Sequence, residues 1–328
     1  MNGTVLAILC ARIGSDRYPG KVLANVSGRT VLEHVVRRLK QAKSVSEVVI
    51  ATSDKDKDNP ICELAVKLKI PLFRGDEYNV AERMYGAYYA FHQSEPFIFR
   101  AMSDSPFLDW QALDEAVTIM LARNWDFVLP LTFEADPVYG AGLFPWSVRC
   151  WKDIYAHSSG EETEHVGMWL RRNLDKWDYG LRDLPHWTFR PYRLELDTKP
   201  DLELIKAIYS AWGKDEPPPL RWVVTWMDKH PGIHALNAHI AEKTGTYTSY
   251  TQAEIDGWKS DYAGREVVWS DVAGLIGDVR DSKEAVYRCE KCGGNLVALS
   301  IRKGDLQTKC IRCGKKRTFY AVKPRRVA

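Results

Sequence analysis

Apolar runs of strand length alternate with amphipathic helical patterns through the first 131 residues of this chain. The apolar runs predict strands at Val5–Leu9, Glu47–Thr52, Pro71–Phe73, Phe97–Met102 and Phe127–Leu131. Helical spacing occupies the segments between them, at Val31–Gln41, Asn59–Leu68, Asn79–His92 and Trp110–Arg123. Strands that alternate with helices of this length form a parallel sheet covered on both faces. Ligands bind such sheets beyond the carboxyl ends of the strands, so we expect the chemistry in the loops after the strands.

The rest of the chain is less regular. Residues 133–195 are rich in Trp and Tyr, and helical patterns return at Pro200–Trp212, Val223–His230 and Ile233–Lys243. Residues 245–285 have no strong periodicity, and residues 286–323 form a compact C-terminal module. We therefore predict a main domain over 1–243, a connector over 244–285 and a small module over 286–328.

Composition places the chain among ordinary globular proteins. Hydrophobic residues make up 45% of the 328 residues and charged residues 27%, and the net charge of +3 is too small to argue for nucleic acid by itself. Neither a signal-peptide pattern nor an apolar segment of about 18 residues is present, so we expect no membrane span. Cys10, Cys62 and Cys150 stand in apolar contexts typical of reduced thiols, and we expect a cytoplasmic protein.

The first predicted strand opens into a loop that is rich in glycine and cations. The loop contains Arg12, Gly14, Ser15, Arg17, Gly20 and Lys21. Glycine allows close backbone approach, amides point at oxygens and the cations neutralise charge, so the loop is suited to a triphosphate. Its spacing fits neither the dinucleotide fingerprint nor the Walker loop. An ordinary strand-to-helix turn with solvated charges is the alternative interpretation.

Residues 11–23 read A-R-x-G-S-x-R-x-P-G-K-x-L, which resembles the signature of the nucleotide-sugar cytidylyltransferases. The spore-coat polysaccharide group is the most similar, and CMP-Kdo and CMP-sialate synthetases are more distant. The resemblance extends from residue 4 to about 243. It implies an α/β fold, a Rossmann-like three-layer sandwich of the nucleotide-diphospho-sugar transferase (GT-A-like) type. It also implies a homodimer in which an acceptor region at about 133–195 reaches a neighbouring subunit.

The family's phosphate contacts fall on Arg12, Arg17 and Lys21 of this sequence, with Gly14 and Ser15 in the same loop. In isolation, Arg17 and Lys21 also fit solvated loop charges. The resemblance assigns the nucleotide pocket to two further segments. Thr52 lies in the one after the second strand, and Arg74, which we place at the cytidine end, lies in the one after the third.

Two aspartates match the family's Mg²⁺ ligands. Asp104 stands two residues before Pro106, in a segment after the fourth strand, and Asp197 matches the first Asp of the family's D-T-P-E-D-L-E segment. Carboxylates are suitable ligands for this cation, which nucleotidyl transfer requires to offset charge on the phosphates. Each aspartate also has a structural alternative. For Asp104 it is an Asx turn or a helix N-cap, a role that Asp109 fits better. For Asp197 it is the N-cap of the following helix. We predict Arg12, Lys21, Asp104 and Asp197 as the catalytic set.

The resemblance assigns acceptor contacts to the family's E-H-V segment, here Glu164, His165 and Val166. We assign a further acceptor contact to Arg193, in the segment before Asp197. A histidine there could position a hydroxyl or act as acid or base. The spore-coat relatives have an acidic G-L-D-V-E-type segment before the E-H-V motif. The corresponding residues of this chain, 138–144, contain no carboxylate. This difference predicts a different acceptor.

The C-terminal module carries two C-x-x-C pairs, Cys289/Cys292 and Cys310/Cys313. Two such pairs at this spacing are typical of a structural Cys₄ zinc ribbon, with a hairpin at Leu296–Ile301 and Leu306–Lys309. Two disulfides are the alternative. Cations and aromatics beside the cysteines suit nucleic acid, whereas a docking or stabilising module is the simpler interpretation.

We therefore predict a CTP- and Mg²⁺-dependent cytidylyltransferase that activates an acidic sugar or related small acceptor as a CMP or CDP conjugate, releasing pyrophosphate. Transfer of another nucleotide, or glycosyl transfer, is the alternative within enzymes, because one fold hosts several chemistries. An adaptor that binds nucleic acid or protein through the zinc ribbon is the alternative outside them. Retention of Arg12, Lys21, Asp104 and Asp197 argues against an adaptor.

Overall fold

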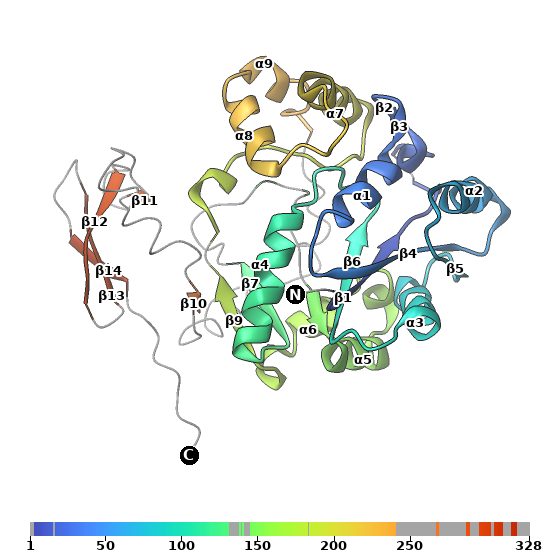
Figure 1. The fold of residues 1–328 in the computed structure, drawn as a ribbon, viewed down its shortest axis with the longest axis horizontal. Coiled ribbons are helices and arrows are strands. Elements are labelled where there is room, and N and C mark those ends of the chain that lie inside the picture. The colour runs from blue at the N-terminus through green and yellow to red at the C-terminus, as the bar shows by residue number, and fades with distance from the viewer. Residues whose placement is uncertain are drawn as a thin grey trace.

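The computed structural model describes residues 3–15, 17–130, 138, 140, 145–182 and 184–240, and beyond them five short strands between residues 267 and 319. Four parallel strands form the main sheet: β1 (Val5–Cys10), β4 (Val45–Ser53), β5 (Leu72–Gly75) and β6 (Phe97–Met102). A short antiparallel strand, β8 (Pro145–Ser147), completes the order β5-β4-β1-β6-β8. The expected parallel α/β sheet is confirmed (Figure 1).

Helices cover both faces of this sheet because side chains of β1 alternate between two cores. Val5, Ala7 and Leu9 pack in a cluster with α1 (Val31–Leu39), α2 (Asn59–Leu68) and α4 (Trp110–Arg123). Leu6, Ile8 and Cys10 pack in a second cluster with α3 (Val80–Phe91) and α5 (Val148–His157). With all six residues of β1 buried, the strand lies at the centre of the molecule, and its carboxyl end opens directly into the cation-rich loop.

The predicted strand after α4 was expected to join the main sheet. The observed strand, β7 (Phe127–Pro130), does not join it. It pairs in parallel with β9 (Tyr179–Arg182), which also pairs with β10 (Val267–Val268). Phe127 stacks on Tyr179 at 4.8 Å between ring centroids, so an aromatic cross-strand contact stabilises this alternative pairing. The short α6 (Met168–Arg171) lies between β8 and β9 in the chain.

A third cluster joins α7 (Lys199–Trp212) and α8 (Leu220–Asp228) to the hairpin of β2 (Asn25–Val26) and β3 (Arg29–Thr30). Figure 1 shows α7, α8 and α9 grouped at one end of the main domain. The predicted helix Ile233–Lys243 is wrong over the described residues: α9 is Pro231–His234, and turns follow it through residue 239. The turns bury the side chain of Asn237, whose Nδ2 donates to Arg193 O at 3.0 Å and Asp201 Oδ1 at 2.8 Å.

The C-terminal strands form an antiparallel sheet in the order β11-β12-β13-β14. They are β11 (Tyr287–Arg288), β12 (Asn295–Arg302), β13 (Asp305–Cys310) and β14 (Lys316–Phe319), and the predicted hairpin is β12–β13. The predicted zinc ligands Cys289, Cys292 and Cys313 lie outside the described residues, as does most of the predicted connector. None of the helices in the described part combines the length and apolar character needed to cross a membrane.

His34 on α1 makes the stability of this fold depend on pH. Burial lowers its pKa to about 4, as do the charges of Arg29, Arg37 and Arg38, against a hydrogen bond with Val26 O that raises it. Below the ordinary pKa of 6.5 the unfolded chain binds a proton that the folded chain excludes. The contribution of neutral His34 to the free energy of unfolding is therefore present above pH 6.5 and is lost as the pH falls toward 4. The loss amounts to about 3 kcal/mol of unfolding free energy.

Replacing His34 with Gln should remove that pH-dependent loss. We expect denaturant titrations at pH 7.5 and 4.5 to differ less for His34→Gln than for the unmodified protein. The exposed His157, changed to Gln, serves as the control and should leave the difference unaltered. An unchanged difference in His34→Gln would show that other groups produce the pH dependence.

Candidate active site

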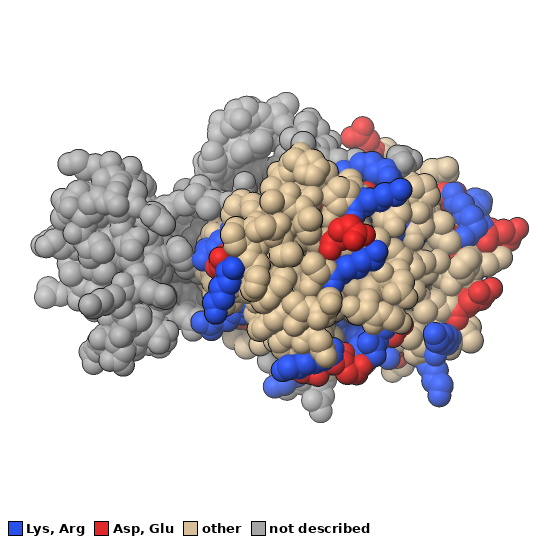
Figure 2. Space-filling model, turned by 90° about the horizontal axis from the view of Figure 1, so that it is seen from above, with Lys and Arg blue, Asp and Glu red and all other residues tan. Residues whose placement is uncertain are grey.

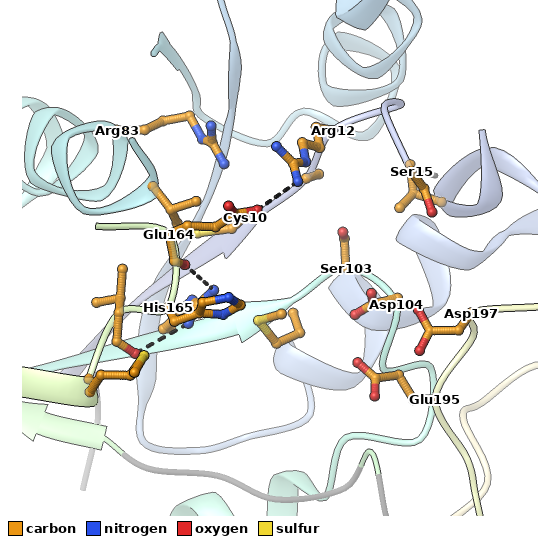
Figure 3. A pocket seen from close by; sticks show the side chains of 18 of the residues that line it. Cys10, Arg12, Ser15, Arg83, Ser103, Asp104, Glu164, His165, Glu195 and Asp197 are labelled. Carbon is orange, nitrogen blue, oxygen red and sulfur yellow. Dashed lines mark hydrogen bonds and ion pairs between the residues drawn. The ribbon is translucent and has the colours of Figure 1, made fainter. Parts of the chain in front are cut away.

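A cavity of about 720 Å³ lies at the carboxyl ends of β1 and β6, where the sequence predicted the chemistry (Figure 3). Nine of the predicted site residues line it: Arg12, Gly14, Ser15, Arg17, Lys21, Asp104, Glu164, His165 and Asp197. They come from the loop after β1, the loop after β6, the segment before α6 and the segment before α7. Distant parts of the chain therefore meet at the sheet edge that parallel topology prepares.

Backbone hydrogen bonds shape the loop after β1. Ile13 N donates to Asp58 Oδ1 at 2.7 Å, and Gly20 N donates to Ile13 O at 3.0 Å, which closes the loop on itself. Gly20 has a φ of 75°, a left-handed conformation that favours glycine, and Lys21 follows it directly. The closed loop directs the Lys21 side chain inward, where the residue is only 8% exposed.

Lys21 bridges two carboxylates from different segments. Its Nζ lies 2.6 Å from Asp104 Oδ2 and 2.8 Å from Asp197 Oδ1. Burial alone would lower the pKa of Lys21, but the two carboxylates outweigh it and raise the pKa above its ordinary value. Burial likewise opposes ionisation of Asp197, yet Lys21, Arg17 and Arg193 hold its pKa below the ordinary range. Lys21 and Asp197 are therefore charged at neutral pH.

Asp197 is fixed from its other side by two arginines. Arg17 Nη2 lies 2.5 Å from Asp197 Oδ2 and Arg193 Nη2 lies 2.6 Å from the same oxygen. Arg193 Nε also pairs at 3.1 Å with Asp201, which is completely buried. Arg193, predicted to contact the acceptor, does not line the cavity; it lies behind Asp197 and positions that carboxylate.

The helix-cap alternatives are resolved by the same contacts. The N-cap of α7 is Thr198, which forms a capping box with Asp201, so Asp197 is not the cap. Asp109 caps α4, with its carboxylate accepting from Gln111 N and Ala112 N. Asp104 caps none of the described helices: Oδ2 accepts from Lys21, and the buried Oδ1 has no hydrogen-bond partner within the described part of the chain.

The donor set of Asp104 and Asp197 fits a divalent cation with oxygen ligands. Both carboxylates converge on one ammonium position, and the unpartnered Asp104 Oδ1 is available as a ligand. Within the part of the chain that the structure describes, three or more His, Cys, Asp or Glu side chains nowhere gather in a metal-binding group. A cation such as Mg²⁺, which usually takes one or two carboxylates plus substrate phosphates and waters, suits this small set.

The opposite wall of the cavity carries the E-H-V segment. Arg12 Nη2 pairs with Glu164 Oε1 at 2.9 Å, and the His165 side chain lies in the cavity (Figure 3). Arg100 on β6 donates to Glu164 O at 3.4 Å and Val166 O at 3.3 Å, which ties the segment to the sheet. The cavity therefore lies between a carboxylate side and a side that contains Arg12 and His165.

Two predicted nucleotide contacts lie outside this cavity. Thr52 is completely buried in β4, and Arg74 donates from its three nitrogens to Ser53 O, Asn59 Oδ1 and Lys55 O. The sequence analysis missed Arg83 and Arg100, which line the cavity. A signal for Arg83 was available, because this cation stands on the apolar face of α3 with Val80, Met84 and Ala87.

The family of the chain follows from its similarity to known proteins. The cytidylyltransferase family model matches residues 6–210, which include both the loop after β1 and Asp197. The chain belongs to the cytidylyltransferase family. This cytidylyltransferase is accordingly a nucleotidyltransferase, an enzyme that uses CTP and releases pyrophosphate when it activates its acceptor as a CMP conjugate.

Two relatives of the cytidylyltransferase match about seven tenths of its chain. An uncharacterized protein of Methanocaldococcus jannaschii is 27% identical over 73% of this chain and 97% of its own length. The spore coat polysaccharide biosynthesis protein SpsF of Bacillus subtilis is 30% identical over 69% of this chain and 95% of its own. The solved structure of a cytidylyltransferase from Leptospira borgpetersenii shares the fold, with a TM-score of 0.64, 24% identity, and coverage of 71% of this chain and 97% of that one.

Surface charge gives no sign of a polyanion partner on the face drawn in Figure 2. Lys and Arg side chains lie beside Asp and Glu over the described surface in this view, so no extended patch has one sign. Nucleic-acid binding generally relies on such a basic patch or stripe. The adaptor alternative, which places binding on the C-terminal module, stays a prediction, because the side chains of that module lie outside the described residues.

Proposed function

We propose that the acceptor of this cytidylyltransferase is an acidic sugar or a closely related small acid, activated as its CMP conjugate with Mg²⁺ as cofactor. The observation that carries the proposal is the Lys21–Asp104–Asp197 cluster beside the Arg12 loop in one cavity. A 3-deoxy-manno-octulosonate cytidylyltransferase of Solibacter usitatus, 29% identical over 42% of this chain and 48% of its own length, supports an acidic acceptor. The overall type would be the three-layer, GT-A-like sandwich of this family.

Each side of the cavity has a distinct role in this proposal. Arg12, Arg17 and Lys21, with the amides of Gly14 and Ser15, hold the triphosphate, and Asp104 and Asp197 hold the Mg²⁺. When bound, the cation supplies Lewis-acid stabilisation of charge on the phosphates. Arg193 and Arg17 keep Asp197 ionised and oriented, so that the carboxylate requires no rearrangement on binding.

Glu164 and His165 orient the acceptor hydroxyl for in-line attack. The hydroxyl oxygen forms a bond to the α-phosphorus of CTP while the bond from that phosphorus to the bridging oxygen of pyrophosphate breaks. His165 accepts the hydroxyl proton, and the pyrophosphate leaves toward Arg12, Arg17 and Lys21. Because Arg12 pairs with Glu164, the same arginine connects the phosphate side to the acceptor side.

The C-terminal cysteines Cys289, Cys292, Cys310 and Cys313 would hold a structural Zn²⁺ in this proposal. The support is their paired C-x-x-C spacing and the antiparallel hairpin β12–β13 between the pairs. Four thiolates fill a tetrahedral shell, so this ion would stabilise the small sheet and take no part in transfer. The boundaries 1–243, 244–285 and 286–328 and a homodimer remain parts of the same proposal.

The test is pyrophosphate release from each of the four nucleoside triphosphates with Mg²⁺, across a panel of acidic sugars, neutral sugars and sugar phosphates. We expect release from CTP, dependent on an acidic member of the panel. Addition of EDTA should abolish the release, and excess Mg²⁺ should restore it. Equal release from other triphosphates, or dependence on a neutral sugar alone, would contradict the proposed substrates.

A further inference from the structure

One side of the cavity carries positive charge that no carboxylate of the described residues balances. Figure 3 shows Arg83 together with Glu164 and His165 on one side, across from Asp104, Glu195 and Asp197. Arg83 on α3 and Arg100 on β6 both line the cavity, and neither forms an ion pair among the residues that the structure describes. The proposed chemistry of phosphate and metal binding uses neither of them.

Arg83 is an unusual place for a charge, since the residue is only 2% exposed. Its Nη1 donates to Asp76 O at 2.5 Å and Glu77 O at 3.0 Å, while its buried Nε has no hydrogen-bond partner among the described residues. Carbonyl oxygens orient a guanidinium but do not neutralise it. A buried charge without an opposite charge is strongly destabilising, so such groups in proteins are normally paired.

Arg100 adds a second positive charge from the neighbouring strand. Arg100 is half-buried. Among the residues that the structure describes, its guanidinium donates only to the carbonyls of Glu164 and Val166, and its buried Nε has no partner. Burial lowers the pKa of Arg83, which Arg12 and Arg100 lower further, against opposing effects of Cys10 and Asp58. The arginines are thus close enough to repel one another.

The nearby carboxylates are engaged elsewhere. Glu77 forms an ion pair with Lys57, and Glu164 forms one with Arg12. Asp58 is buried against Ser53 and the amide of Ile13. The uncompensated charge of Arg83 and Arg100 therefore calls for an anion that is not part of the described chain.

Apolar side chains form much of the wall beside these arginines. They include Val80, Leu129, Trp146, Val166, Met168 and Leu174. A ligand covered with hydroxyls would leave many polar groups without partners against such a wall. A ligand that presents a charged group to the arginines and carbon atoms to the wall leaves no polar group of its own without a partner there.

We propose that Arg83 and Arg100 form a subsite for a carboxylate or phosphate-type group of the acceptor, whose adjoining part packs an apolar face on the Trp146 side of the cavity. This inference rests on the proposed function and narrows the acceptor to acids with a carbon face free of hydroxyls. The subsite is separate from the triphosphate, so an anion occupies it while CTP is bound. Guanidinium–anion pairs of this kind are charge-assisted and specific in geometry.

Calorimetric titration of the full chain, with CTP present and ionic strength held constant, tests the subsite with simple probes. Benzoate and phenylphosphonate carry the two anionic groups on an apolar body, and benzamide is the neutral match of benzoate. We expect at least one anion to bind at least about tenfold more tightly than benzamide, as one charge-assisted hydrogen bond implies. The stronger of the two anions identifies which group the subsite prefers.

Arg100→Met and Arg83→Met should each weaken the anion at least about tenfold and leave the dissociation constant of CTP within about twofold. Arg37→Met, a partly exposed arginine on α1 paired with Asp215, is the matched control and should change neither constant. If thermal melting shows that Arg83→Met does not fold, Arg83→Lys, which keeps the charge, should retain anion binding, and Arg100→Met carries the comparison.

Three results would overturn the subsite: competition between the anion and CTP, binding equal to that of benzamide, or binding unaffected by both arginine variants. Competition would assign Arg83 and Arg100 to the triphosphate instead. The same titrations measure CTP binding. If the unmodified protein did not bind CTP, that result would contradict the proposed function rather than the subsite alone. The two failures are therefore distinguishable.

Discussion

Asp104→Asn should lower kcat for pyrophosphate release from CTP by about a hundredfold to a thousandfold, the range for losing one preorganised group that stabilises transition-state charge. Asp104 is the carboxylate whose second oxygen is buried without a partner, and an amide there is a far weaker ligand for Mg²⁺. Lys21 keeps its contact with Asp197, so the fold of the loop persists. We expect the dissociation constant of metal-free CTP to stay within about threefold while the Mg²⁺ requirement rises.

The control for this experiment is Asp54→Asn. Asp54 is an aspartate after β4 whose side chain is 57% exposed and, among the described residues, pairs only with the neighbouring Lys55. It carries the same change of charge outside the cavity and should retain full kcat. A loss of CTP binding that matches the loss of kcat in Asp104→Asn would place Asp104 in nucleotide recognition instead of catalysis.

Asp201→Asn should lower the free energy of unfolding by about 3–5 kcal/mol, because it leaves the buried Arg193 without one of its partners. Asp201 is completely buried, pairs with Arg193 at 3.1 Å, and accepts from the backbone amides of Asp197 and Thr198. Removing its charge weakens both the cap of α7 and the support beneath Asp197. Denaturant titration at pH 7 measures the change.

The matched control is Glu203→Gln, two residues along α7, where the carboxylate is 60% exposed and pairs with Lys206. Its expected change is below about 0.5 kcal/mol. In the double variant Arg193→Met with Asp201→Asn, the loss should be smaller than the sum of the single losses, because the pair acts as a unit. Additive losses would show that Asp201 stabilises the fold independently of Arg193.

Strong periodicity made most of the sheet and its helices predictable. Asn59–Leu68 and Trp110–Arg123 were predicted with the observed bounds, and β6 matches its apolar run. The fate of β7 was not predictable, because apolar content specifies a buried strand but not which neighbour it pairs with. The helix Val148–His157 was missed within a Trp-rich region, although Ser147 caps it and Cys150, Trp151 and Ile154 form its buried face.

The candidate site was predicted unevenly for physical reasons. A motif assigns residues that share one loop, so the residues from Arg12 to Lys21 were placed together. Asp104 and Asp197 joined them in the prediction because Asp104 follows a strand and Asp197 precedes a helix. Arg74 and Arg193 could not be placed, because the direction of a long side chain depends on partners such as Asn59 and Asp201. Arg83 belongs to none of the quoted motifs, and only its place on the apolar face of α3, beside Val80 and Met84, could have indicated it.

The contacts of Lys21 also have a consequence for the order of folding. Lys21 meets Asp104 across 83 residues of sequence and Asp197 across 176. Contacts between distant positions form late, because closing a long loop costs chain entropy before any contact repays it. A chain still being synthesised can therefore complete β1, β4, β5 and β6 while its site lacks Asp197. Enzymatic competence should arrive as a separate, later event than compaction of the sheet.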